Sequence, residues 1–255
     1  MFSKKAAFAA ICAVASLGVS ALVARADTIT SSVKLSGGSY QYSDGGEFAM
    51  HFVTNTVPDL KDQQVFCVEI KEDISFGTTY YGALSEQIKY NAGLFSAINQ
   101  PPATNLAEIQ YLFYQFSTGN LANYTASGSQ RQLDAGALQW AIWDLAGENP
   151  GNPNPGFNLA NLEASQVGLG TKATGFEAAA ALAVAGGWTN NQSLGTVKIL
   201  NLYTGVDGNG QGTGSAQDQL VLVSTPLPST AAAGCGMLAG LAVLVMARKK
   251  RVLGA

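Results

Sequence analysis

Apolar and polar residues alternate along the first part of the chain, and this pattern predicts β-strands. Paired glycines at 37–38 and 45–46 are typical of turns between such strands. The predicted strands are residues 28–36, 39–43, 47–55 and 63–70. Two more strand-like segments near the other end of the chain, 196–204 and 218–224, are expected to form a closing hairpin.

Between these two groups of strands, the apolar residues recur at helical spacing. The predicted helices are residues 80–98, 104–117, 130–147 and 172–185. The sequence NPGNPNPG at 149–156 is typical of a loop. Strands followed by helices and then by strands predict an α+β fold, in which a helical block is inserted into a β-rich domain. The β-rich part is expected to be a sandwich or a barrel.

Both ends of the chain have the composition of targeting segments. Residues 1–26 combine two early lysines, an apolar stretch and the cleavage pattern Ala24-Arg25-Ala26, which predicts a signal peptide. Residues 231–247 are uncharged and mostly apolar, at the short end of the length range for a transmembrane helix. A basic cluster follows at 248–251, and positive charge stays on the cytoplasmic side. The domain at 27–224 is therefore expected outside the membrane.

The charges are distributed unevenly. Seven of the 14 Lys and Arg residues lie in the two ends, whereas all 17 Asp and Glu residues lie between them. Seven basic against 17 acidic residues give the central domain a formal charge of −10. This charge argues against nucleic acid or an anionic lipid surface as a partner.

The sequence offers little for metal or enzyme chemistry. His51 is the only histidine, so a multi-histidine metal site is impossible, and its place in an alternating strand indicates a structural role. The segment 207–218 partly resembles a calcium loop, but Asp218 stands where a bidentate Glu is usual, which favours a hairpin loop. Glu69 with Glu72 and Asp73 is interpreted as a solvated strand end, which leaves a secreted hydrolase as the third functional reading. We expect no cofactor, no metal and no enzymatic turnover.

Gln139 occupies an unexpected position in the helix predicted for residues 130–147. A helical wheel places it on the face of Ala135 and Ala146, while the charged residues Asp134, Asp144 and Glu148 lie on the opposite face and are expected to face solvent. Gln139 is therefore expected to face the core. A buried amide without partners costs about 1–3 kcal/mol, so this side chain needs a partner.

Cys67 is the single cysteine of the central domain, so an internal disulfide is impossible there. It lies in the strand sequence VFCVEI, where Phe66, Val68 and Ile70 share one face and Cys67 points the other way. A helix packed on that second face of the sheet would lie close to the thiol. The common fate of a free cysteine is to be buried and inert.

Together, FCVEI around Cys67 and Gln139-Trp140-Ala141-Ile142-Trp143 resemble the bacterial thioester domain. The resemblance implies that the Cys67 thiol and the Gln139 amide condense into an internal thioester and release ammonia. Trp140 and Trp143 would then shield the bond from water. It also implies covalent capture of an amine-bearing surface ligand, as in an adhesin. The alternative is a structural or interaction module of the same fold, in which Cys67 stays free.

The C-terminal segment 225–255 resembles the PEP-CTERM sorting signal. The matching features are the short apolar helix 231–247, a motif and a basic tail. The motif is Pro226, Leu227, Pro228 and Ser229, and the tail is Arg248, Lys249, Lys250 and Arg251. The resemblance implies an exosortase-type processing enzyme as a partner and a membrane anchor through the helix. It also implies an exported protein that is released to the cell surface or the extracellular matrix after processing.

Overall fold

The computed structural model of the chain describes residues 28–42, 45–70, 72–89, 103–148 and 168–225. The predicted signal peptide, the predicted sorting motif, the predicted membrane helix and the basic tail all lie outside the described residues. Among the helices of the described part, none has both the length and the apolar character needed to cross a membrane.

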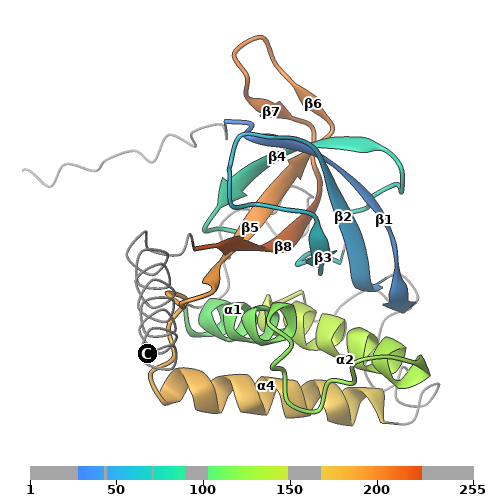
Figure 1. Cartoon of the computed structure of the whole chain (residues 1–255), viewed down its shortest axis with the longest axis vertical. Helices are drawn as coiled ribbons and strands as arrows, with labels where there is room; N and C mark the ends of the chain where they lie inside the picture. The colour runs from blue at the N-terminus through green and yellow to red at the C-terminus, as the bar shows by residue number, and fades with distance from the viewer. Residues whose placement is uncertain (1–27, 43–44, 71, 90–102, 149–167, 226–255) are drawn as a thin grey trace, which may run out of the picture.

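Six antiparallel strands form a sheet in the order β3-β2-β1-β4-β5-β8. Their bounds are Ser31–Tyr42 for β1, Gly45–Asn55 for β2, Gln63–Val65 for β3, Thr79–Ser85 for β4, Gly195–Tyr203 for β5 and Ala216–Ser224 for β8. The segment after β3 returns to β8, because the Leu220 amide donates to the Phe66 carbonyl (2.9 Å) and the Val68 amide donates to the Asp218 carbonyl (3.1 Å). The sheet is thus closed into a barrel (Figure 1).

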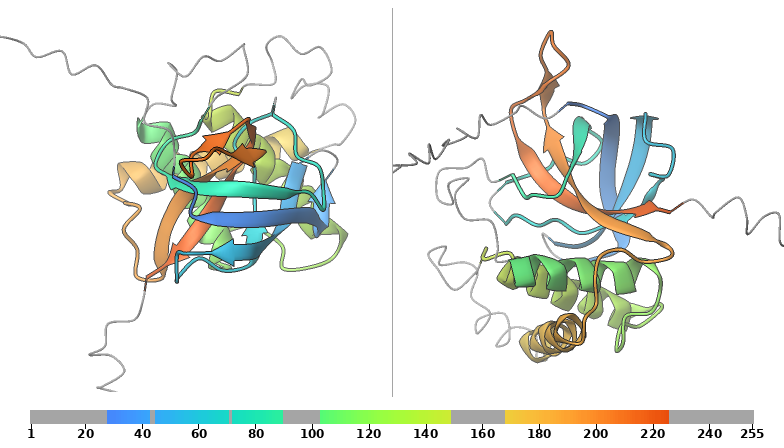
Figure 2. Two further views of the ribbon diagram at one scale, coloured as in Figure 1. Left: turned by 90° about the horizontal axis from the view of Figure 1, so that it is seen from above. Right: turned by 90° about the vertical axis from the view of Figure 1, so that its left-hand side faces the viewer.

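Three described helices form a layer beneath the barrel, and their bounds are Ala103–Ser117 for α1, Ser129–Leu145 for α2 and Leu169–Ala185 for α4. Helices α1 and α2 pack against the strands, and α4 packs on α1 and α2 from the far side (Figures 1 and 2). Two short strands, β6 (Gly205–Val206) and β7 (Gly212–Thr213), form a hairpin that projects from the barrel. The predicted α+β class is confirmed, with the helical block inserted between strands.

Two predicted elements are wrong in the described residues, and the strand predicted for 63–70 is shorter than expected because it ends at Val65. The turn expected at 37–38 lies inside the single long strand β1, because Gly38 lets the backbone of β2 approach closely: a Cβ at Gly38 would lie 2.3 Å from the Glu47 carbonyl oxygen. The helix expected from residue 80 begins instead as strand β4, which pairs with β1 on one side and with β5 on the other. Pairing with two strands that are distant in sequence outweighs the local helical spacing.

The prediction that Asp134 and Glu148 face solvent is also wrong. Asp134 is fully buried, because α4 and the barrel leave almost no side of α2 open. Glu148 is 3 % exposed and lies beyond the end of α2 at Leu145. Asp134 is compensated by Lys172 on α4 and by hydrogen bonds from the Gln130 amide (2.8 Å) and the Thr125 backbone (2.7 Å). A buried charge is tolerated only with such partners.

An ion pair joins the start of α2 to the barrel. The Arg131 guanidinium donates to both carboxylate oxygens of the fully buried Glu47 on β2, from Nε at 2.7 Å and from Nη2 at 3.0 Å. Arg131 also donates to the Gln64 amide oxygen (2.9 Å) and lies over the Tyr40 ring. The Tyr124 hydroxyl donates a further bond to Glu47 (2.5 Å). These bonds set the position of α2 relative to β2.

Each of the three helices contributes one carboxyl to a cluster, with Glu108 on α1, Asp144 on α2 and Glu177 on α4. Burial, followed by the negative charges of Asp144 and Glu108, raises the pKa of Glu177 from its ordinary value of 4.5 to about 7. Glu177 is therefore largely protonated in the folded protein below neutral pH.

We expect this cluster to make stability depend on pH. Because the pKa of Glu177 is higher in the folded state, its stabilising contribution is complete below the unfolded pKa and is lost as the pH rises through about 7. Thermal unfolding followed between pH 5 and pH 8 should show a falling Tm over this window, and Glu177→Gln should flatten the fall. The exposed carboxyl of Asp73 provides the control. A Glu177→Gln chain with the same pH profile as Asp73→Asn would contradict this expectation.

Candidate functional site

Cys67 and Gln139 meet in the interior, between the barrel and helix α2. The Cys67 Sγ atom lies 3.3 Å from Gln139 Oε1, and Gln139 Nε2 donates a hydrogen bond to the Cys67 carbonyl oxygen at 2.7 Å. A C=O bond is about 1.2 Å long, so the sulfur lies within about 4.5 Å of the Gln139 amide carbon, which is contact distance. Cys67 is fully buried and Gln139 is 1 % exposed.

Each residue is held by a separate part of the fold. Cys67 lies just after β3 in the segment that closes the barrel, where it forms an antiparallel bridge with Gln219 of β8. Gln139 lies in α2, which packs against β1 and β2. Gly136 allows close packing here, because a Cβ on it would lie 2.8 Å from the Tyr42 ring. Gly45 does the same, since its Cβ would lie 2.8 Å from Gln139 Cγ.

The surroundings keep the thiol neutral. Burial raises the pKa of Cys67 above its ordinary value, and the nearby carboxylate of Glu148 raises it further. A neutral, water-excluded thiol is a weak nucleophile. Any acyl transfer to Cys67 therefore needs a polar group that stabilises negative charge on the sulfur.

Acidic residues close to Cys67 are buried, which corrects the interpretation of Glu69 and Glu72 as a solvated strand end. Glu69 is 2 % exposed and Glu72 is 7 % exposed, whereas Asp73 is exposed as expected. Burial, and then the nearby Asp218 carboxyl, raise the pKa of Glu69 to about 10, so this carboxyl is protonated at neutral pH. The Asp218 backbone amide donates to Glu69 at 2.9 Å. Sequence spacing carries no signal for this pair, because Glu69 follows β3 whereas Asp218 lies in β8, far away in the chain.

Glu148 is a further residue near the site that sequence reasoning placed elsewhere. Helix α2 ends before Gly147, whose φ of 78° turns the chain back, and the Glu148 amide then donates to the Trp143 carbonyl at 2.9 Å. This turn brings the Glu148 carboxylate to the Ile70 amide (3.3 Å), three residues after Cys67. A glycine just after the helical pattern is the sequence signal for such a turn.

The two tryptophans expected to shield the pair lie beside it in α2. Trp140 and Trp143 are each 3 % exposed, and their rings meet edge to face with centroids 5.8 Å apart. Gly45 also touches Trp143, since a Cβ there would lie 3.0 Å from its ring atom Cη2. Large apolar rings therefore lie close to the Cys67–Gln139 contact.

Other candidate features of the sequence lie apart from this pair. His51 is on β2 with an exposed side chain and contacts Asp62 at 2.5 Å. Asp207 accepts backbone hydrogen bonds from Asn209 (2.9 Å) and Gln211 (2.8 Å), so it closes the turn of the β6–β7 hairpin. This confirms the hairpin interpretation of the segment at 207. In the described part of the chain, no group of His, Cys, Asp or Glu is arranged to hold a metal ion.

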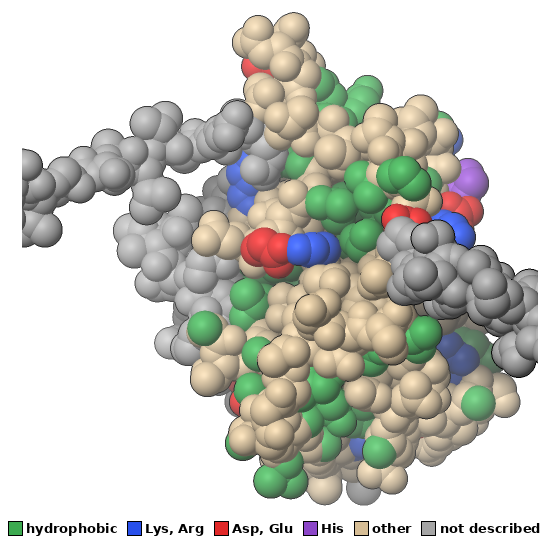
Figure 3. Space-filling model, turned by 60° about the vertical axis from the view of Figure 1, so that its left-hand side comes forward, with side chains coloured by type: hydrophobic (Ala, Val, Ile, Leu, Met, Phe, Trp, Pro, Cys, Tyr) green, Lys and Arg blue, Asp and Glu red, His purple; other side chains and the backbone are tan. Residues whose placement is uncertain are grey.

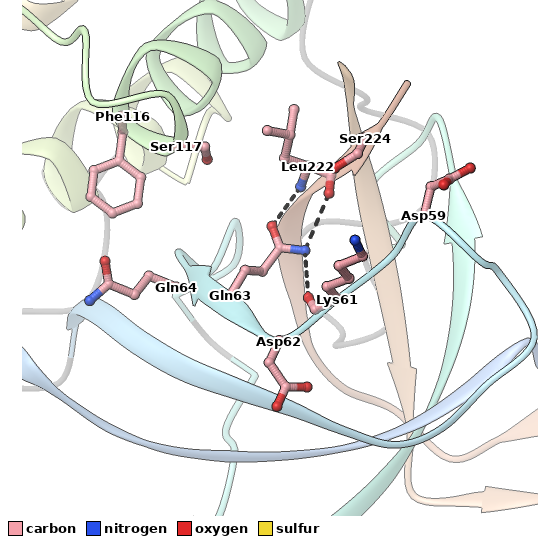
Figure 4. Close-up of a pocket in the computed structure, with 9 residues that line it drawn as sticks. All are labelled: Asp59, Lys61, Asp62, Gln63, Gln64, Phe116, Ser117, Leu222 and Ser224. Atoms are coloured by element: carbon pink, nitrogen blue, oxygen red, sulfur yellow. Dashed lines mark hydrogen bonds between the residues drawn. The ribbon is translucent and has the colours of Figure 1, made fainter. Parts of the chain in front are cut away.

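A surface pocket of about 210 Å³ opens between β3, β8 and the end of α1 (Figure 4). Gln63 lines this pocket, and its amide oxygen accepts a hydrogen bond from the Leu222 backbone amide at 2.8 Å (Figure 4). Its lining includes neither Cys67 nor Gln139, so the interior pair is separate from this pocket. Figure 3 shows one face of the molecule, where few charged side chains occur and apolar side chains are spread over both layers.

No protein-family model matches the chain, and no curated protein sequence matches it. A solved structure that it is similar to is the N-terminal thioester domain of the fibronectin-binding protein SfbI from Streptococcus pyogenes. The identity is 12 %, the match covers 78 % of this chain and 95 % of that chain, and the TM-score is 0.42. A likeness at this level carries no inference about function, which must come from the residues of the site.

Proposed function

We propose that this chain is an exported surface or matrix protein that captures an amine-bearing ligand through an internal thioester between Cys67 and Gln139. The observation that carries the proposal is the contact of the Cys67 sulfur with the Gln139 amide, 3.3 Å from Oε1, between two residues with almost no exposure. The condensation joins Sγ to the amide carbon and releases Nε2 as ammonia, which takes the thiol proton.

A thioester is an acyl group activated toward amines. An incoming amine, such as a lysine side chain on a surface, attacks the acyl carbon and forms an amide, and the Cys67 sulfur leaves and takes up a proton. Burial between α2 and the barrel supports this role, because the bond must be kept from water until the ligand arrives. The reaction happens once for each chain, so we propose a binding protein and not an enzyme.

The sequence features of the two ends complete the proposal. Residues 1–26 direct export, and residues 225–255 act as a sorting signal with a membrane helix, which an exosortase-type enzyme processes. The domain then stays outside the cytoplasmic membrane, anchored or released to the cell surface or the extracellular matrix. The acidic central domain fits partners other than nucleic acid.

Intact mass spectrometry tests the thioester directly. We expect the purified chain to be lighter by one ammonia than its sequence requires, relative to a Cys67→Ala chain prepared in the same way, so that any processing of the ends cancels. Incubation with methylamine should add one methylamine to the native chain and none to the variant. A native chain with its full sequence mass and no methylamine uptake would contradict the proposal.

One observation favours the alternative, a structural or interaction module with a free Cys67. Both polar ends of the Gln139 amide are already satisfied by Cys67, one through the thiol and one through the backbone carbonyl at 2.7 Å. A buried amide whose oxygen and nitrogen each have a hydrogen-bond partner needs no chemical role. The same mass measurement separates the two functions, because this module has no ammonia deficit and does not react with methylamine.

A further inference from the structure

The edge of β8 that faces β3 is paired in two different ways along its length. At Leu220 the partner is backbone, because the Leu220 amide donates to the Phe66 carbonyl at 2.9 Å. At Leu222 the partner is a side chain (Figure 4). Gln63 Oε1 accepts a hydrogen bond from the Leu222 amide at 2.8 Å, and Gln63 Nε2 donates to the Leu222 carbonyl at 3.3 Å. The backbone pairing that closes the barrel is therefore interrupted at Leu222.

The Gln63 side chain takes the place of one residue of a neighbouring strand. In an antiparallel ladder, two hydrogen-bonded residues exchange both of their N–H to O=C bonds. The Gln63 amide makes the same two bonds with Leu222. Beyond it, the Ser224 amide donates to the Asp59 carbonyl at 3.2 Å. An extended peptide offers N–H and C=O groups of the same kind, so it can replace the Gln63 amide on β8.

The pocket of about 210 Å³ opens beside this interruption, and Gln63 and Leu222 both line it (Figure 4). From α1, Ser117 adds a hydroxyl oxygen that is buried and has no hydrogen-bond partner among the described residues. Buried polar groups are normally hydrogen-bonded, so this hydroxyl is available to a ligand in the pocket. The pocket thus joins a replaceable strand partner to an unused polar group.

The same pocket adjoins the segment that carries Cys67. Phe116 lines the pocket, and its ring packs edge to face, at 4.9 Å between centroids, against Phe66, the residue before Cys67. Along β8, Leu222 is three residues from Gln219, which forms the bridge with Cys67. Three residues of a strand span about 10 Å. A peptide bound at Leu222 therefore lies about 10 Å along the strand from the thiol.

We propose that the pocket between β3 and β8 binds an extended, lysine-bearing polypeptide segment through backbone pairing with Leu222, and holds its lysine beside the Cys67 segment. The inference rests on the proposed thioester and gives its ligand class, a polypeptide and not a free small amine. The charged residues that line the pocket are Asp59, Asp62 and Lys61, a net negative set that favours a basic segment. The lysine amine attacks the acyl carbon, an amide forms, the Sγ–carbon bond breaks, and the sulfur takes up the proton that the amine loses.

Docking is tested without the thioester in a full-length Cys67→Ala chain. The probe is the peptide acetyl-Thr-Val-Lys-Val-Thr-amide. Its control is the same peptide with N-methylated backbone amides, which keeps the side chains and the charge but has no backbone donors. We expect the peptide to shift the NMR signals of the Leu222 backbone amide and the Gln63 side-chain amide, and the control peptide to leave both in place. No shift with either peptide, or equal shifts with both, would overturn the proposal.

A second comparison asks whether the peptide replaces the Gln63 side chain. In the same Cys67→Ala chain, Gln63→Ala should bind the peptide about tenfold more tightly, because the group that competes for Leu222 is gone. Gln132→Ala is the matched control, since its exposed side chain also donates to a backbone carbonyl, that of Gln41 at 2.7 Å, and does not line the pocket. Its affinity should equal that of the Cys67→Ala chain. Equal affinities in the two glutamine variants would contradict replacement of Gln63.

Covalent uptake by the native chain links the docking site to the thioester. Intact mass should show the peptide added at least about 10-fold faster than its N-methylated control at the same concentration, because docking raises the local concentration of the lysine amine. Equal rates would show that docking at Leu222 does not deliver the lysine. If the native chain has no ammonia deficit, the proposed function fails, and the NMR comparison in the Cys67→Ala chain still decides the docking site.

Discussion

Gln139→Glu is expected to abolish the ammonia deficit and the methylamine uptake completely. The substitution keeps the size and shape of the side chain, but a carboxyl has no ammonia to release and is not activated toward a thiol. In the structure the Gln139 amide contacts both the thiol and the carbonyl of Cys67, so its chemical nature and not its bulk is what the proposed reaction uses. Intact mass before and after incubation with methylamine measures both properties.

Two matched variants make this result specific. Cys67→Ser removes the sulfur with little change in volume, and it should give the same loss of both properties. Gln219 is also fully buried and forms an antiparallel bridge with Cys67, but its amide nitrogen donates to the Gln217 carbonyl at 3.0 Å. Gln219→Met should therefore keep the deficit and the methylamine uptake.

A purely structural Gln139 predicts a different outcome. In that case Gln139→Glu lowers stability, by about 1–3 kcal/mol for a buried hydrogen bond that is poorly replaced, and the mass of the native chain shows no deficit to lose. One chemical phenotype shared by substitutions at 67 and 139, and absent at 219, has no explanation in packing. Uptake of methylamine by Gln139→Glu at the native rate would rule out Gln139 as the acyl donor.

Arg131→Met is expected to lower the free energy of unfolding by about 3–5 kcal/mol, because it leaves the Glu47 carboxylate buried without its ion-pair partner. Glu47 is fully buried, and the remaining bond from Tyr124 cannot neutralise a charge. Chemical denaturation measures the change. Loss of this ion pair also removes one of the contacts that hold α2 against β2. These two elements meet at Gln139 and Gly45.

The ion pair between the half-buried Lys198 and the exposed Glu86 provides the comparison, because neither of its charges is fully buried. Lys198→Met should cost no more than about 1 kcal/mol, since exposed pairs are solvated whether or not they form. In the double variant Glu47→Leu with Arg131→Met, both charges are removed, and much of the lost stability should return. An Arg131→Met chain no less stable than Lys198→Met would show that Glu47 is neutralised by another route.

Local periodicity determined the general plan of this protein. Alternation over residues 47–55 and helical spacing over 104–117 and 130–147 predicted elements that the structure contains, because each reflects a single buried face. The same reasoning placed Gln139 toward the core and Cys67 toward a helix. Both positions follow from the spacing of neighbours within one element, so the sequence alone was sufficient for them.

The tertiary structure decided whether some segments form a helix or a strand, and whether some polar faces are exposed or buried. Helical spacing predicted a helix over 80–98, yet residues 79–85 form β4 because β1 and β5 offer hydrogen bonds on both edges. Asp134 and Glu148 have the pattern of an exposed face, yet both are buried because α4 and the barrel cover that face as well. A sequence pattern shows that one face is apolar, but it does not show whether a neighbour also covers the polar face.

The chemistry around Cys67 belongs to the tertiary structure for the same reason. The sequence by itself determined that a core-facing glutamine and a cysteine in a strand-like segment exist, and that both ends of the chain have the composition of targeting signals. Only the closure of the barrel and the docking of α2 brought Gln139 to within 3.3 Å of the sulfur and the Asp218 amide to Glu69. These groups come from segments far apart in the chain, and their pKa values and contacts depend on burial and distance, which no local pattern specifies.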